Sequence, residues 1–288
     1  MANFLRFFSA LLFLSIPVSS QLNELFFPGF KDLSTNITLR RDAKIEKKGS
    51  LCLTNDTSNF LQGQAFYSSP IQFKNSTNGQ VFSFSSSFAL GIVPRFPELG
   101  GHGLAFTISP SNELNGTSSQ HLGLFSRTNM GSFSNHLFAV EFDTFQNLEF
   151  GDIDGNHVGI DINNLSSNVS FTAAYFDDSS TKQNLSLTSG KPILAWIDYD
   201  ASENLLNVTI SPNSAKPRLP LLSFNVNLSP IFHEFMYIGF SSATGQLSSS
   251  HYILGWSFKI NGEARALDLH SLPSIPVKKK NPGLTIRL

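Results

Sequence analysis

The segment from Ala139 to Asn163, AVEFDTFQNLEFGDIDGNHVGIDIN, carries a dense set of oxygen and nitrogen donors between two apolar runs. Glu141 and Asp143 stand two residues apart, so on a β-strand both carboxylates project from the same face. Carboxylates this close repel one another unless a cation lies between them. Oxygen donors beside one imidazole suit a hard cation such as Ca²⁺ next to a divalent transition ion that accepts nitrogen. The further donors of the segment are Asn147, Asp152, Asp154, His157 and Asp161.

Simpler interpretations of this segment account for less of it. Acidic loop residues are often merely solvated, and a single histidine after a loop is often structural, but the donors here are dense and regularly placed. An EF-hand loop begins well with Asp152, Asp154 and Asn156, but His157 stands where that loop requires glycine. A metal site of another kind is therefore predicted.

A sugar-cleaving enzyme is the sharper alternative. Retaining glycosidases need two carboxyl groups flanking the sugar bond, and β-glucanases of similar sandwich architecture carry a second glutamate further along the strand that holds Glu141 and Asp143. Here Phe145 and Gln146 occupy those positions. We therefore expect a binding protein rather than an enzyme.

Four further motifs flank this segment in a fixed order, and together they resemble the legume lectins, also called L-type lectins. The resemblance runs from about Gln21 to Leu272, and the motif sequences are most similar to those of the extracellular domain of plant lectin receptor kinases. The motifs are GGHGLAFTISP (Gly100–Pro110), SSQHLGLFS (Ser118–Ser126), KPILAWIDYD (Lys191–Asp200) and FSSATGQLSSSHYILGWSFKINGEA (Phe240–Ala264).

Abundant phenylalanine and recurring Ser/Thr/Asn-rich turns predict a large all-β core. The resemblance narrows this to a concanavalin-like jelly-roll sandwich of antiparallel sheets. Trp196 and Trp256 are expected in the core, and the lone Cys52 is expected as a small buried hydrophobe. The predicted strands are Ala65–Ser68, Val81–Leu90, Gly103–Ile108, Leu137–Asp143, Val158–Ile162, Val169–Tyr175, Ile193–Tyr199, Asn204–Ile210, Leu221–Val226, Met236–Phe240 and Tyr252–Ile260.

The resemblance implies two adjacent metal ions. Ca²⁺ would take Asp143, Asn147, Asp152 and the backbone carbonyl of Phe145. A transition ion, usually Mn²⁺, would take Glu141, Asp143, Asp152 and His157. Ser167 falls where the family often has a hydroxyl near the transition ion, whereas Asp154 and Asp161 are expected as loop and surface residues.

The resemblance also implies a sugar site, with two departures from the family pattern. His102 replaces an aspartate, and a neutral imidazole offers one donor and one acceptor where a carboxylate accepts twice; its titration is expected near pH 6.5. Gln120 lies where the family supplies a backbone N–H at a glycine. Phe145 and Asn147 are retained, and Gln246 and Leu247 lie in the loop that sets specificity.

The termini predict an exported protein. Residues 1–20 resemble a signal peptide, 21–272 the lectin domain, and 273–288 a Pro- and Lys-containing tail. Only eight residues follow Lys280, short of the ~20 that a membrane span requires, so a product without transmembrane helix or kinase is expected. The acceptor sites for N-glycosylation are Asn36, Asn55, Asn75, Asn115, Asn164, Asn168, Asn184, Asn207 and Asn227.

The function expected from the sequence is that of a secreted carbohydrate-binding protein of the plant apoplast, acting in extracellular recognition or defence. The alternative is a perception or decoy domain for a non-sugar extracellular ligand. With net charge −1 and 14% charged residues, no nucleic-acid partner is expected. A homodimer is left open.

Overall fold

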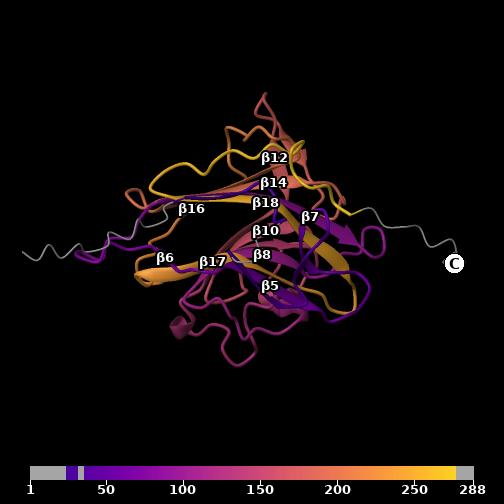
Figure 1. Ribbon diagram of the computed structural model, residues 1–288, viewed down its shortest axis with the longest axis horizontal. Helices are drawn as coiled ribbons and strands as arrows, with labels where there is room; N and C mark the ends of the chain where they lie inside the picture. The colour runs from indigo at the N-terminus through magenta and orange to yellow at the C-terminus, as the bar shows by residue number, and fades with distance from the viewer. Residues whose placement is uncertain (1–23, 32–35, 277–288) are drawn as a thin grey trace, which may run out of the picture.

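The computed structural model describes residues 24–31 and 36–276, so the expected signal peptide and Lys278–Lys280 lie outside the described residues. Two antiparallel sheets of eight strands each are stacked face to face, with a small two-stranded sheet beside them (Figure 1). The predicted all-β, antiparallel architecture is confirmed.

The back sheet has the order β16-β15-β14-β7-β18-β4-β3, and β1 pairs with the same long strand β18 that β4 contacts. Its strands are β1 (Glu24–Phe27), β3 (Lys44–Ile45), β4 (Leu51–Thr54), β7 (Phe84–Pro94), β14 (Ile193–Asp200), β15 (Leu205–Ser211), β16 (Leu222–Asn225) and β18 (Ser249–Ile260).

The front sheet has the order β11-β10-β9-β8-β17-β5-β2, with β6 paired to β17, and it contains the donor-rich segment in β9 and β10. Its strands are β2 (Ile37–Arg41), β5 (Gln62–Tyr67), β6 (Ile71–Gln72), β8 (Gly103–Ser109), β9 (Phe138–Asp143), β10 (His157–Ile162), β11 (Val169–Thr172) and β17 (Phe235–Ala243). Three short 3₁₀ turns lie in its loops: η1 (Ser119–His121), η2 (Phe133–Asn135) and η3 (Leu148–Phe150).

Aromatic side chains fill the space between the sheets. Phe240 from the front sheet lies with its ring centroid 5.0 Å from those of both Phe88 and Trp256 in the back sheet. The buried indole N–H of Trp256 donates to Ser86 Oγ at 3.1 Å, so the ring is buried without an unpaired donor. Burial of Trp256, Trp196 and Cys52 confirms their predicted core positions.

The outer face of the back sheet is covered by residues 264–276, which we call the C-terminal strap. Leu267 and Leu272 are buried there against Trp196 and neighbouring apolar side chains. A Cβ at Gly255 would lie 2.6 Å from Leu272 Cδ2, so the strap sits in a place that only glycine leaves open. Residues 273–276, the start of the predicted Pro- and Lys-containing tail, follow Leu272 along the sheet, and Ile275 packs over Gly91.

Several strand bounds differ from prediction by three or four residues, and one predicted strand is divided in two. The predicted strand Val169–Tyr175 is two strands, because Ala173 N–H donates to the carbonyl of Asn156 and its carbonyl accepts from Leu185. The chain therefore leaves β11 and forms β12 (Ala174–Phe176), paired with β13 (Lys182–Asn184) outside both large sheets. The short strands β1, β2, β3, β4, β6 and β13 were not predicted.

Among the residues that the structure describes, none lies in a helix with the length and apolar character that a membrane crossing needs.

Candidate functional site

The donor-rich segment lies on the outer face of the front sheet. Phe138, Val140 and Phe142 of β9 point into the core between the sheets, which places Glu141 and Asp143 together on the opposite face. Antiparallel pairing sets His157 of β10 directly opposite Asp143. Ligand atoms of Glu141, Asp143 and His157 all lie within 4.8 Å of one another.

The His157 ring is fixed by its two nitrogen atoms. Nδ1 donates to the carbonyl of Asp154 at 2.7 Å, so Nε2 faces Glu141 Oε1 at 3.3 Å. Burial acts to lower the pKa of His157, but the hydrogen bond and charge of Glu141, with the charge of Asp143, outweigh it and raise the pKa to about 9. Without a metal ion, protonated His157 thus supplies the positive charge that balances the carboxylates of Glu141 and Asp143.

The loop between β9 and β10 adds oxygen donors held by its own backbone. Phe145 N–H donates to Asp143 Oδ1 at 2.6 Å, and Asn147 N–H donates to Asp152 Oδ2 at 2.6 Å. Asn147 Oδ1 is buried and has no hydrogen-bond partner among the described residues. An unpaired buried carbonyl oxygen costs on the order of 1–3 kcal/mol, and coordination to Ca²⁺ would remove that penalty.

The carboxylates are held where their charges are costly. Burial, followed by the charge of Glu141, raises the pKa of Asp143 well above its ordinary value. Burial is also the largest effect at Asp152 and raises its pKa to about 6. Burial favours the neutral form of these carboxyl groups, and a divalent cation bound between them would stabilise the ionised form. Glu141, Asp143 and His157 form a buried cluster whose donor atoms suit a transition ion, and Asn147 Oδ1 offers a further oxygen that suits Ca²⁺. Asp152, which was expected to bridge both ions, is half-buried and lies outside that cluster.

Asp161 is a correction to the sequence analysis. Expected on the surface, it is fully buried on the same face of the sheet as Glu141, because the register of β10 carries it inward beside the loop that holds Ser167. Ser167 Oγ lies 2.5 Å from Glu141 Oε1 and 2.9 Å from Asp161 Oδ1. Burial and the charge of Glu141 raise the pKa of Asp161. Asp154 lies in a loop, as expected, and its carboxylate accepts from Asn156 N–H.

The structure places His102 and Phe145 together at the edge where β8 begins and β9 ends. The ring centroids of His102 and Phe145 are 4.6 Å apart, and Phe145 is 36% exposed. Gln246 is exposed and Leu247 half-buried in the loop after β17. The Gln120 side-chain amide donates to Glu149 Oε1 at 2.9 Å.

His102 differs from the sequence expectation in its titration. It is only 6% exposed, and burial lowers its pKa to about 4 despite an opposing effect of the Asn147 side chain. The ring is therefore neutral at pH 6.5. Its Nε2 lies 3.0 Å from Ser119 Oγ, a partner that the sequence analysis missed because Ser119 is far along the chain. Its Nδ1 is buried and makes no hydrogen bond of standard geometry in the described part of the chain, although the Asn147 side chain lies near enough to act on the pKa of the ring by hydrogen bonding.

Residues 23–274 match the family model described as the legume lectin domain. The chain belongs to the legume lectin domain family. Among curated relatives of this lectin domain, the L-type lectin-domain containing receptor kinase V.9 of Arabidopsis thaliana is 56% identical over 80% of the chain. The receptor kinase SIT2 of Oryza sativa subsp. japonica is 44% identical over 96% of the chain. The lectin domain spans 34% and 42% of the lengths of these two relatives.

Solved structures of this fold are similar across most of the lectin domain. Lectin II from Ulex europaeus is 30% identical, with a TM-score of 0.71 over 83% of this chain and 98% of that one. Arcelin-5, a lectin-like defense protein from Phaseolus vulgaris, is 27% identical, with a TM-score of 0.67 over 82% of this chain and 97% of that one. The jelly-roll fold that the resemblance implied is confirmed.

Proposed function

We propose that this lectin domain binds glycans at the edge formed by His102, Phe145 and Asn147, and that two metal ions hold this edge in place. The observation that carries the proposal is Asn147. Its side-chain oxygen is buried without a partner, while its backbone N–H is fixed by Asp152. With Ca²⁺ on the oxygen, the amide nitrogen is left to donate to a sugar hydroxyl, so one side chain links metal to ligand.

In this proposal the two ions share some of their protein ligands. Ca²⁺ takes Asp143, Asn147, Asp152 and the carbonyl of Phe145. The transition ion, Mn²⁺ or a similar divalent cation, takes Glu141, Asp143, Asp152 and His157. Loading this ion displaces the proton from His157 Nε2, so metal binding releases protons and weakens in acid.

The sugar face is formed by an aromatic ring and polar groups. The exposed ring of Phe145 offers an apolar surface to a pyranose, and neighbouring polar groups of His102 and Asn147 set its orientation. Gln120, Gln246 and Leu247 lie around this edge and would contact larger glycans. Lectin UEA-II, which is 29% identical, has been solved in complex with galactose, which makes galactosides the first sugars to test.

A second candidate function rests on His102. In the neutral ring one nitrogen is engaged by Ser119, and the other lies buried, so the residue presents fewer hydrogen-bonding atoms than a carboxylate would. This favours weak binding of free monosaccharides and leaves room for a non-sugar extracellular ligand on the same scaffold.

An extracellular location is part of the proposal. The curated relatives are named receptor kinases, and all nine predicted N-glycosylation sites have exposed or half-buried asparagines. Asn55, Asn75 and Asn227 each accept the backbone N–H of the residue two positions on, a turn that presents the acceptor at the surface.

Metal content tests the first part of the proposal. Protein equilibrated with both ions and then dialysed should retain Ca and Mn on elemental analysis, whereas Asp143→Ala, which removes the shared ligand, should retain neither. Asp177→Ala is the matched control, since Asp177 is a loop carboxylate outside the site. Wild-type protein without bound metal would contradict the proposal.

A further inference from the structure

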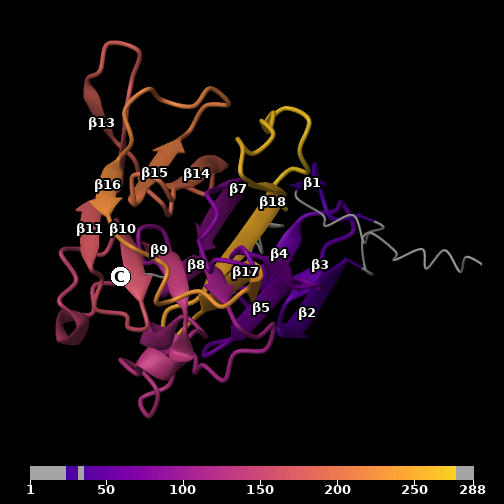
Figure 2. The same ribbon diagram turned by 90° about the vertical axis from the view of Figure 1, so that its left-hand side faces the viewer.

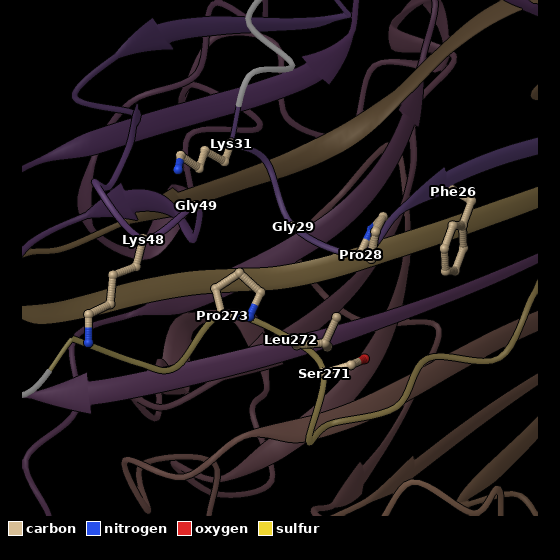
Figure 3. A pocket seen from close by; sticks show the side chains of 9 residues that line it. All are labelled: Phe26, Pro28, Gly29, Lys31, Lys48, Gly49, Ser271, Leu272 and Pro273. Atoms are coloured by element: carbon tan, nitrogen blue, oxygen red, sulfur yellow. The ribbon is translucent and has the colours of Figure 1, made fainter.

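A second concave site lies outside the metal-bearing loops. A groove of about 540 Å³ opens between the segment that follows β1, the turn that precedes β4, and the C-terminal strap (Figure 3). This volume is in the range of small-molecule sites, roughly 300–1,000 Å³. Figure 2 shows β1 on the opposite side of the molecule from β9, β10 and β11. The groove is lined by residues that include Phe26, Pro28, Lys31, Lys48, Leu272 and Pro273.

The walls of the groove are held in place by the fold. Phe30 N–H donates to the carbonyl of Gly49 at 2.7 Å, which joins the segment after β1 to the turn before β4. Phe26 is paired to Ser257 in β18, and the Arg265 guanidinium stacks 4.0 Å from the centroid of its ring. Leu272 is only 9% exposed where it packs over the back sheet. The groove is therefore preformed.

The charge in the groove is unbalanced. Lys31 and Lys48 are both exposed, and within the described residues neither has an ion-pair or hydrogen-bond partner. Nearby lysines differ, since Lys44 pairs with Glu46 at 3.0 Å and Lys259 with Glu24 at 3.9 Å. Among the described residues that line the groove, none is acidic.

The two kinds of lining are separated in space. Figure 3 shows the side chains of Lys31 and Lys48 at one end of the groove, with Phe26 and Pro28 toward the other and Leu272 and Pro273 along the side. A ligand that satisfies both ends has an anionic group and an apolar body.

We propose that this groove binds a small organic anion with an apolar body. Its carboxylate or sulfonate accepts hydrogen bonds from Lys31 and Lys48, and its body lies along Phe26, Pro28 and Leu272. The C-terminal strap supplies one wall, so a bound ligand contacts the C-terminal end of the domain. The site is independent of the proposed glycan edge and of the metal ions.

The test uses 8-anilinonaphthalene-1-sulfonate, which is fluorescent in apolar surroundings, titrated into the full chain. Saturable binding with one site per chain is expected. The double variant Lys31→Gln, Lys48→Gln should bind about tenfold more weakly, the effect of losing two partly solvated charge pairs. Lys47→Gln, an exposed neighbour outside the groove, is the matched control and should bind like wild type.

A competition experiment separates the two halves of the site. Decanoate should displace the probe, whereas acetate, which has the charge without the body, should not. The neutral N-phenyl-1-naphthylamine should bind wild type and the double variant equally. Binding of the sulfonate that the double variant leaves unchanged would overturn the proposal, and so would displacement by acetate as effective as by decanoate. Lysine-dependent dimerisation without probe binding would instead assign the groove to a second copy and also overturn it.

Discussion

Gly159 lies directly opposite Glu141 on the neighbouring strand, and the absence of its side chain leaves the space that the Glu141 carboxylate fills. A Cβ at this glycine would stand 2.6 Å from Glu141 Oε1, closer than real atoms approach. The Ser167 hydroxyl occupies the same space and hydrogen-bonds that oxygen. One glycine thus fixes the position of the innermost proposed metal ligand.

Gly159→Ala should therefore displace Glu141 and weaken the transition-ion site. Overpacking of this kind costs roughly 1–3 kcal/mol in the free energy of unfolding, and Mn²⁺ affinity measured by calorimetric titration should fall at least about tenfold. Gly262→Ala is the control, since its new Cβ would meet only the flexible end of Lys259. Unaltered Mn²⁺ affinity in Gly159→Ala would show that Glu141 is not a ligand.

The effect of Asp143→Ala on thermal stability should reverse between metal-free and metal-loaded protein. A buried carboxylate with a raised pKa is unfavourable in the metal-free protein, so in chelator the variant should unfold at the same temperature as wild type or higher. With Ca²⁺ and Mn²⁺ at a hundredfold excess over Kd, wild type should gain on the order of 3 kcal/mol and the variant nothing. Thermal unfolding by calorimetry in both conditions measures this crossover, and parallel behaviour of the two proteins would argue against a metal role.

His251 makes stability depend on pH. Thr54 has a single hydroxyl hydrogen, which it gives to the carbonyl of Ser249, so His251 Nδ1 donates to Thr54 Oγ1 at 2.6 Å and the buried ring is neutral. Burial lowers the pKa of His251 to about 3. Below pH ~6.5 the His251 imidazole is therefore protonated in the unfolded state but stays neutral in the folded state until the pH approaches 3.

Stability from this group is complete above pH ~6.5 and is lost as pH falls toward 3, by about 1.4 kcal/mol per pH unit. His251→Asn keeps a donor near the position of Nδ1 and removes the titration. The difference in the free energy of unfolding between wild type and variant, measured by urea unfolding from pH 7.5 to 4.5 in chelator, should shrink as pH falls. The difference isolates His251 because Asp152, with its raised pKa, acts in the opposite direction in both proteins. A constant difference would refute the assignment.

His102→Asp should strengthen binding of free monosaccharides. Wild type is expected to bind methyl galactosides or mannosides with Kd no better than about 1 mM, equivalent to roughly −4 kcal/mol. A carboxylate at this position can accept two hydroxyl hydrogens, and affinity should rise about tenfold. Ser119→Ala, which frees His102 Nε2 but introduces no carboxylate, is the control. Micromolar wild-type binding that His102→Asp leaves unchanged would contradict this account of the pocket.

Several features of the site follow from the sequence because they are local. The spacing of Glu141 and Asp143 places both on one face of β9, and the structure bears this out. The burial of Asp161 could not be predicted this way, because it depends on the register that pairs His157 with Asp143 and on the loop that folds Ser167 over the sheet.

The same distinction holds for the fold. The long alternating strands of the core were predicted. Two-residue β6 was not, because its pairing comes from β17, which is distant in sequence, and two-residue β3 is too short to show an alternating pattern although it pairs with the next strand, β4. The prolines after Leu272 are typical of a linker, and nothing local indicates that Gly255 and Gly91 leave room for Leu272 and Ile275.

Glycan binding with and without metal tests the central claim most directly. A glycan array is probed with the full chain in Ca²⁺ and Mn²⁺, again after chelation, and again after both ions are restored. The account predicts a defined set of bound glycans whose signal is lost on chelation and returns with the ions. Binding that persists undiminished in chelator, or a metal-loaded protein that binds no glycan, would contradict it.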